Sequence, residues 1–203
     1  MDIDRTAHWE KVYEIKAPSQ VSWTQDYPKT SFEIIQSFEL PKTAKIIDVG
    51  GGDSKLVDCL LDAGYEDITV LDISEKALLR AQKRLGNKAS KVNWVVSDIT
   101  TFKPDRSFDV WHDRAAFHFL TEAEQISQYV ALATSCVKGY LSVGTFSKQG
   151  PVKCSGLNIS QYSEEELMSV FSSGFHLLDS KIEDHKTPFD TLQNFLFCSF
   201  KKK

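Results

Sequence analysis

Three consecutive glycines, Gly50 to Gly52, stand between two aspartates, Asp48 and Asp53, directly after an apolar run. Glycine loses more conformational freedom on folding than any other residue, so a triplet indicates a turn that requires it. A glycine-rich turn between a first strand and a first helix binds nucleotides in doubly wound folds. Asp72 follows 22 residues after Gly50, near the ~20-residue spacing of an acidic residue that binds ribose hydroxyls. The pattern therefore predicts a nucleotide-type cofactor.

The residues of the turn favour some classes of cofactor over others. The dinucleotide pattern G-x-G-x-x-G is incomplete, because Lys55 stands at its last position, and the sequence has no P-loop pattern. Asp48 and Asp53 would repel a pyrophosphate, whereas a cationic sulfonium with an α-amino group would be attracted to them. The charges favour S-adenosylmethionine.

The elements that must position these residues alternate along the chain. Apolar β-branched runs predict strands and helical periodicity predicts helices, and the last two strands follow one another with no helix between them. The expected strands are 45–49, 67–72, 91–98, 107–113, 139–147, 175–184 and 191–201, and the expected helices are 54–64, 75–86, 121–137 and 163–175. Capping boxes are expected at Thr121–Glu124 and Ser163–Glu166. The sequence predicts an α/β, doubly wound, Rossmann-like sheet of about seven strands, mostly parallel, with a C-terminal antiparallel hairpin and helices on both faces.

Composition limits the other classes of function. A length of 203 residues suits a single domain, 1–203, and the net charge of −4 gives no basic face for nucleic acid. No apolar run predicts a signal peptide or a membrane span, so a cytoplasmic protein is expected. The four cysteines form no CxxC pair, which favours reduced thiols over a disulfide framework or a metal site. Oligomeric state stays open.

The segments "IIDVGGGDS", "VLDIS" and "VVSDIT" resemble the successive motifs of class I, seven-stranded S-adenosylmethionine-dependent methyltransferases. The resemblance covers about residues 30–203 and implies a terminal antiparallel hairpin in the sheet. It also implies contacts to the cofactor: Asp48 and Gly50, Gly51 and Gly52 beside its methionine and ribose, Asp72 on the ribose hydroxyls, Ile73 and Ile99 against adenine, and Asp98 on the adenine amino group. Asp53 departs from the family pattern, in which many members have another glycine.

The N-terminal "HWEKVYEIKAPSQVSWTQ" resembles a subgroup of uncharacterised bacterial enzymes and elongation-factor lysine methyltransferases. The resemblance implies a lid, residues 1–29, that closes over a catalytic core, 30–203. Trp23, in a polar loop, is then a candidate to pack on the sulfonium. Trp9 and Tyr13 either join it or dock an aromatic stripe on the core.

The acceptor is expected beyond the fourth strand, where "WHDRAAFHFL" is rich in ionisable groups. His118 and Asp113 are the first candidates for a catalytic base, and His185 is a further one. Asp113 could instead pair with Arg114 in a structural ion pair. Cys154, flanked by glycine and proline, is expected to be accessible, and no metal ligand set is predicted.

These features favour a methyltransferase that acts on an oxygen, nitrogen or sulfur atom of a small molecule and releases S-adenosylhomocysteine. The alternative is a protein-lysine N-methyltransferase. A nicotinamide-dependent oxidoreductase is disfavoured by Lys55 and by the terminal hairpin. A nonenzymatic partner protein is disfavoured because the glycine turn and Asp72 are both kept.

Overall fold

The computed structural model describes residues 4–203 and has a seven-stranded sheet at its centre, in the order β3-β2-β1-β4-β5-β9-β8. Five strands run parallel: β1 (Lys45–Val49), β2 (Asp67–Asp72), β3 (Val92–Val96), β4 (Phe108–Arg114) and β5 (Val137–Phe146). The other two, β8 (Phe175–Lys186) and β9 (Leu192–Lys202), are antiparallel to their neighbours. The predicted fold, including the terminal hairpin, is confirmed.

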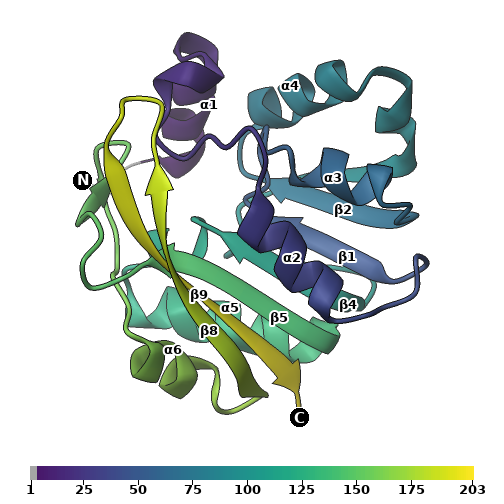
Figure 1. Cartoon of the computed structure of the whole chain (residues 1–203), viewed down its shortest axis with the longest axis vertical. Helices are drawn as coiled ribbons and strands as arrows, with labels where there is room; N and C mark the ends of the chain where they lie inside the picture. Colours follow the sequence, from purple (N-terminus) through teal and green to yellow (C-terminus); the bar gives the residue numbers. More distant parts are fainter. Residues whose placement is uncertain (1–3) are drawn as a thin grey trace.

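Helices cover both faces of this sheet. Figure 1 shows α2 (Lys29–Ser37) and α3 (Leu56–Asp62) in front of the sheet and α5 (Ala123–Cys136) behind it. The core around α2 and α3 also takes in α4 (Glu75–Leu85), and the core around α5 takes in α6 (Glu164–Phe171). Successive side chains of a strand point to opposite faces, so Ile46 packs in the first core and Ile47 in the second.

Shorter elements complete the chain. Helix α1 (Arg5–Ile15) packs beside α4, and the strands β6 (Lys153–Cys154) and β7 (Leu157–Asn158) form a small separate ladder. Three 3₁₀ turns connect larger elements: η1 (Pro18–Gln20), η2 (Gly86–Lys91) and η3 (Phe117–Phe119). None of the helices among residues 4–203 is long and apolar enough to cross a membrane.

The two expected capping boxes have different outcomes. At α6, the Ser163 hydroxyl accepts from the Glu166 amide and the Glu166 carboxylate accepts from the Ser163 amide, as predicted. At α5, the helix begins at Ala123 after Glu122, whose side chain caps nothing. The expected box at Thr121 is therefore wrong, because the helix begins one residue too late for Thr121 to be its N-cap.

Candidate active site

A cavity of about 330 Å³ lies where the ends of β1, β2 and β4 meet α1 and the segment after it. It lies beside the topological switch point, because β1 pairs with β2 on one side and with β4 on the other. All but Gly52 of the residues expected to bind the cofactor line the cavity: Asp48, Gly50, Gly51, Asp72, Ile73, Asp98, Ile99 and Trp23. The fold thus brings together residues from four separate segments of the sequence.

The glycine turn is required by its own protein neighbours. Gly50 and Gly52 adopt left-handed φ angles of 66° and 50°, which cost a side-chain-bearing residue free energy. A Cβ on Gly51 would lie 2.6 Å from an Asp48 carboxylate oxygen. A Cβ on Gly52 would lie 2.7 Å from the Tyr13 hydroxyl. The turn therefore allows Asp48 and Tyr13 to approach the backbone.

Asp53 fits the turn although many relatives have glycine there. Its φ is not among the left-handed values, so a side chain is tolerated. Its carboxylate lines the cavity 3.7 Å from Nη1 of Arg80 on α4. Burial raises the pKa of Asp53, while Arg80 and Arg84 oppose that rise.

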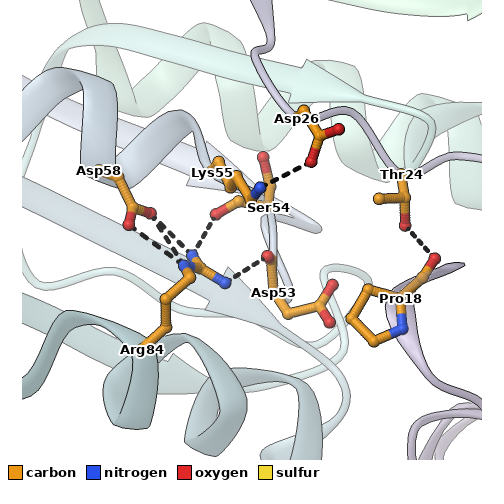
Figure 2. A network of polar contacts seen from close by, with 8 residues as sticks. All are labelled: Pro18, Thr24, Asp26, Asp53, Ser54, Lys55, Asp58 and Arg84. Carbon is orange, nitrogen blue, oxygen red and sulfur yellow. Dashed lines mark hydrogen bonds and ion pairs between the residues drawn. The ribbon is translucent and has the colours of Figure 1, made fainter.

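Arg84 on α4 fixes the outer side of the same turn. Figure 2 shows its guanidinium donating to the backbone oxygens of Asp53 and Ser54, at 2.7 and 2.8 Å, and to the Asp58 carboxylate. In the same view, Lys55 Nζ lies 2.8 Å from the Asp26 carboxylate. The turn is thus connected both to α4 and to the N-terminal segment.

Asp72 is buried at the end of β2, where one carboxylate oxygen accepts from the Ser74 amide at 2.8 Å. Burial raises the pKa of Asp72 to about 7, and the nearby Asp48 and Asp53 add to the rise. Asp98 follows β3 in a loop, where it accepts from the amide and hydroxyl of Thr100, both at 2.8 Å. Each aspartate is held rigidly at the cavity wall by its own backbone turn.

Aromatic rings from α1 and the following segment form another wall of the cavity. The Trp9 ring centroid lies 5.6 Å from that of Trp23 and 5.1 Å from that of Phe119. Tyr13 lies beside both tryptophans, and its backbone oxygen accepts from Arg80 of α4. Trp9, Tyr13, Trp23 and Phe119 all line the cavity, so the aromatic stripe faces the site.

His112 pairs with Asp48 across the switch point, and it was not among the residues predicted for the site. The two residues are register partners on β4 and β1, and His112 Nδ1 lies 2.7 Å from an Asp48 oxygen. Both side chains are buried and both residues line the cavity. Among residues 4–203, Nε2 of His112 has no hydrogen-bond partner. An Asp–His pair of this kind fixes the ring tautomer and leaves Nε2 as an acceptor.

Asp113 lies on the opposite side of β4 from His112. It is fully buried, and its carboxylate accepts from the Ala116 and Phe117 amides and from the Tyr129 hydroxyl. Burial raises the pKa of Asp113 to about 6, and these hydrogen bonds oppose the rise. Asp113 does not line the cavity, so its placement corrects the expected role as a catalytic base: it holds the turn after β4.

His118 and His185 are likewise outside the cavity wall. The His118 ring is fully buried between Phe119 and Phe146, and neither ring nitrogen has a partner among the residues that the structure describes. Burial, together with Arg114, lowers the pKa of His118 to about 3, so the ring is neutral. His185 Nε2 lies 2.7 Å from the Ser22 backbone oxygen. The structure thus corrects both expected catalytic roles, and His185 anchors the N-terminal segment instead.

Two further residues line the cavity, Arg114 at the end of β4 and Cys154 in β6. Cys154 is 5% exposed, which corrects the expectation of an accessible thiol, and burial raises its pKa to about 12. Arg114 donates from Nη1 to the Trp23 backbone oxygen at 3.0 Å. It has no carboxylate within 4.0 Å among residues 4–203, so the alternative of an ion pair with Asp113 is not formed.

The alternation of side chains along β4 explains why His112 was not predicted as a site residue. Trp111 and Asp113 face α5, while Val110, His112 and Arg114 project to the other side of the sheet. The period of two was readable in 108–114, but only the neighbouring strand β1 identifies the side that faces the cavity. Ala115 then adopts a left-handed φ of 65°, a conformation that favours glycine.

Comparisons with known proteins agree with this geometry. Residues 46–139 match the family model of a methyltransferase domain. The chain is 29% identical over 122 residues to the eEF1A lysine and N-terminal methyltransferase of Mus musculus, an alignment that covers 59% of this chain but only 17% of that relative. It is 22% identical over 189 residues to EEF1A lysine methyltransferase 2 of Homo sapiens, covering 85% of this chain and 74% of that relative.

Among solved structures, a 1,6-didemethyltoxoflavin-N1-methyltransferase from Burkholderia thailandensis, with bound 1,6-didemethyltoxoflavin and S-adenosylhomocysteine, superposes with a TM-score of 0.73. The match has 17% identity and covers 98% of this chain and 87% of that one. The matched methyltransferase domain and the seven-stranded fold agree with the resemblance predicted from the glycine turn, Asp72 and Asp98.

Proposed function

We propose that this chain transfers the methyl group of S-adenosylmethionine to an oxygen, nitrogen or sulfur atom of a small-molecule acceptor. The observation that carries the proposal is the single cavity that joins the glycine turn, Asp72 and Asp98 to an aromatic wall. The neighbour with S-adenosylhomocysteine bound and the methyltransferase domain match support it.

The residues at the cavity fit S-adenosylmethionine, which supplies an electrophilic methyl group on a sulfonium when bound. Asp72 would hold the ribose hydroxyls and Asp98 would hold the adenine amino group. The acidic wall of Asp48 and Asp53 suits a cationic ligand, as do the faces of Trp9 and Trp23. The chain aligns the acceptor and excludes water, an effect of roughly 7–11 kcal/mol for well-oriented reactants.

His112 lines the cavity, unlike Asp113, His118 and His185, and is proposed as the base that removes a proton from the acceptor. The Asp48 carboxylate accepts a hydrogen bond from Nδ1–H of His112, so the free lone pair of the ring is on Nε2. When Nε2 accepts a proton, the Asp48 carboxylate stabilises the imidazolium that forms. His112 therefore replaces His118, Asp113 and His185 as the proposed base.

The positive charge of Arg114 bears on whether the acceptor is a small molecule or a protein lysine. Arg114 lines the cavity near Trp23 and carries a positive charge, which repels a protonated lysine side chain. This favours a small acceptor. The lysine methyltransferase activity named for the curated relatives keeps a protein substrate as the second candidate.

The N-terminal segment is proposed to act as the lid of a single-domain enzyme. Residues 1–29 would close over a core of residues 30–203, with α1 held against α4 by Lys76, which lies 3.2 Å from Glu14. Arg80 adds a bond to the Tyr13 backbone oxygen. Closure over the cofactor would bring Trp9 and Trp23 against the sulfonium.

The experiment that tests the function is a calorimetric titration with S-adenosylmethionine, S-adenosylhomocysteine and NAD, followed by an acceptor assay. We expect saturable binding of the two sulfur ligands and none of NAD. Methyl transfer from labelled cofactor is then measured on a metabolite library and, separately, on purified eEF1A. Binding of NAD alone would refute the methyltransferase proposal, and methylation of eEF1A without any small acceptor would replace the first candidate by the second.

A separate pair of variants tests the proposed role of His112 as the catalytic base. We expect His112→Gln to bind S-adenosylhomocysteine nearly as the unaltered chain does and to lose turnover, while His118→Gln keeps turnover in whatever fraction folds. Full activity of His112→Gln at neutral pH would remove it as the base.

A further inference from the structure

Four basic side chains line the cavity, and the protein itself holds three of them. Arg84 donates to two backbone oxygens of the glycine turn and to a carboxylate of α3. Arg5 donates to oxygens of η3 and α5, and Arg114 donates to the N-terminal segment while its other nitrogens are shielded from solvent. The fourth is Lys55, whose Nζ has one partner among residues 4–203, the Asp26 carboxylate at 2.8 Å. Lys55 is therefore the cation of the wall that can most easily change partner.

The pair between Lys55 and Asp26 is exposed to water. The Asp26 side chain is 99% exposed and the Lys55 side chain is 41% exposed. Ion pairs of this kind add little stability, because both charges stay hydrated and are screened by salt. A second carboxylate that reaches Lys55 from the cavity can therefore displace Asp26, which keeps its hydration when the pair is broken.

Lys55 lies at the end of the cavity where the glycine turn faces the N-terminal segment. It stands two residues after Asp53 and directly before α3. Figure 2 shows both side chains on this turn, with Asp26 and Thr24 of the N-terminal segment beside them. Asp53, Lys55 and Thr24 all line the cavity. An acidic and a basic side chain therefore stand at the same end of the site.

This combination of charges matches the amino-acid end of S-adenosylmethionine. That end carries an ammonium and a carboxylate on one carbon atom, so a site for it needs an anion and a cation close together. Asp53 supplies the anion and Lys55 supplies the cation. Because the lysine ammonium is a compact charge on a flexible stem, it can turn from Asp26 to a ligand without movement of the backbone.

We propose that Lys55 binds the carboxylate at the methionine end of the cofactor, in exchange for Asp26. The inference rests on the proposed function and adds a basis for selection to it. The site distinguishes the intact cofactor from its decarboxylated form, because that form offers Lys55 no anion. Asp26 competes with the ligand for the same ammonium.

Calorimetric titration with S-adenosylhomocysteine and with its decarboxylated analogue, which has hydrogen in place of the carboxylate, tests the contact. We expect Lys55→Met to lose about tenfold or more in affinity for S-adenosylhomocysteine, the scale of a hydrogen bond to a charged group. Its affinity for the analogue should equal that of the unaltered protein. Lys55→Arg keeps the charge and should keep most of the affinity. Lys88→Met, the matched control, removes an exposed ion pair with Asp62 outside the cavity wall and should change neither affinity.

A variant of Asp26 separates ligand binding from a structural role of the pair. Asp26→Asn removes the competitor and leaves the ammonium free, so we expect moderately tighter binding of S-adenosylhomocysteine. Lys55→Met and Asp26→Asn break the same ion pair, yet their effects on affinity should have opposite signs. If the pair only fastened the N-terminal segment to the turn, both variants would weaken binding alike, and the proposal would be overturned.

The remaining outcomes distinguish this inference from the proposed function. Equal affinity of Lys55→Met and the unaltered protein for S-adenosylhomocysteine would remove Lys55 from the site and leave the proposed function intact. Equal losses for S-adenosylhomocysteine and its analogue in Lys55→Met would show that the carboxylate is not the group bound, which also overturns the inference. Absence of binding of either sulfur ligand by the unaltered protein would refute the proposed function together with the role of Lys55.

Discussion

At the scale of single residues, the cavity wall contains carboxylates whose pKa values are raised by burial. Asp72 is buried with only one hydrogen bond from its own turn and lies near two further aspartates, Asp48 and Asp53. Such a group binds ribose hydroxyls best when it is ionised, because only the carboxylate accepts at both oxygens. Its protonation in the free protein therefore competes with ligand binding.

Affinity for S-adenosylhomocysteine should depend on pH through Asp72. The pKa of Asp72 is raised to about 7 by burial, so binding below that value must first remove a proton. We expect calorimetric affinity to rise by up to about tenfold per pH unit below 7 and to level off above it. Asp72→Asn should bind more weakly and give a flat profile. An unchanged profile in that variant would show that another group titrates.

Asp113 acts through the turn after β4 and is a positioning residue. Asp113→Ala leaves two buried amides and the Tyr129 hydroxyl without their acceptor. We expect a loss of about 1–3 kcal/mol in the free energy of unfolding, measured by urea denaturation. Asp109→Ala, at a half-buried position near the start of the same strand, is a control for the strand. Full stability with lost turnover in Asp113→Ala would return Asp113 to a direct catalytic role.

At the scale of elements, α1 is attached to the core by charges along α4. Lys76 pairs with Glu10 and Glu14, and Arg80 reaches both the Tyr13 backbone and Asp53. Exposed ion pairs each contribute little stability, so this attachment suits an element that opens and closes. If α1 acts as the proposed lid, its opening would govern ligand release.

Arg80→Met should release the ligand faster. It removes both the bond to the Tyr13 backbone and the ion pair with Asp53 at the cavity wall, and we expect the dissociation rate of S-adenosylhomocysteine to rise several-fold. Tryptophan fluorescence in a stopped-flow competition measures the rate, because Trp9 and Trp23 line the cavity. Arg106→Met is the control, because Arg106 lies just before β4 and pairs with Asp67 at the start of β2. Equal rates in both variants would contradict the lid.

At the scale of the whole molecule, cofactor binding is linked to global stability. The cavity joins the ends of three central strands to α1, so a ligand that fills it stabilises the native state against the unfolded chain. We expect S-adenosylhomocysteine at 100 times its dissociation constant to contribute about 2.7 kcal/mol. For a chain of this size that raises the unfolding midpoint by about 5–11 °C. NAD at equal concentration should leave the midpoint unchanged, and a shift with NAD alone would contradict the cofactor assignment.

The sequence by itself determined the features that depend on local backbone chemistry. The glycine triplet, Asp72 at its fixed spacing and the alternation of strand and helix patterns predicted the sheet and the part of the cavity wall around Asp48, Gly50 and Asp72. The two final strands, with no helix between them, predicted their antiparallel pairing. These are short-range effects, because turn geometry and side-chain periodicity are properties of adjacent residues.

Only the tertiary structure decided which ionisable residues face the cavity. "WHDRAAFHFL" contains four ionisable residues, and β1 decided among them by supplying Asp48 to His112 while α5 enclosed Asp113. The burial of His118 and Cys154 and the anchoring of Ser22 by His185 depend on segments distant in the chain. Burial and pairing set the charge of a side chain, and both are created when the sheet brings distant strands together.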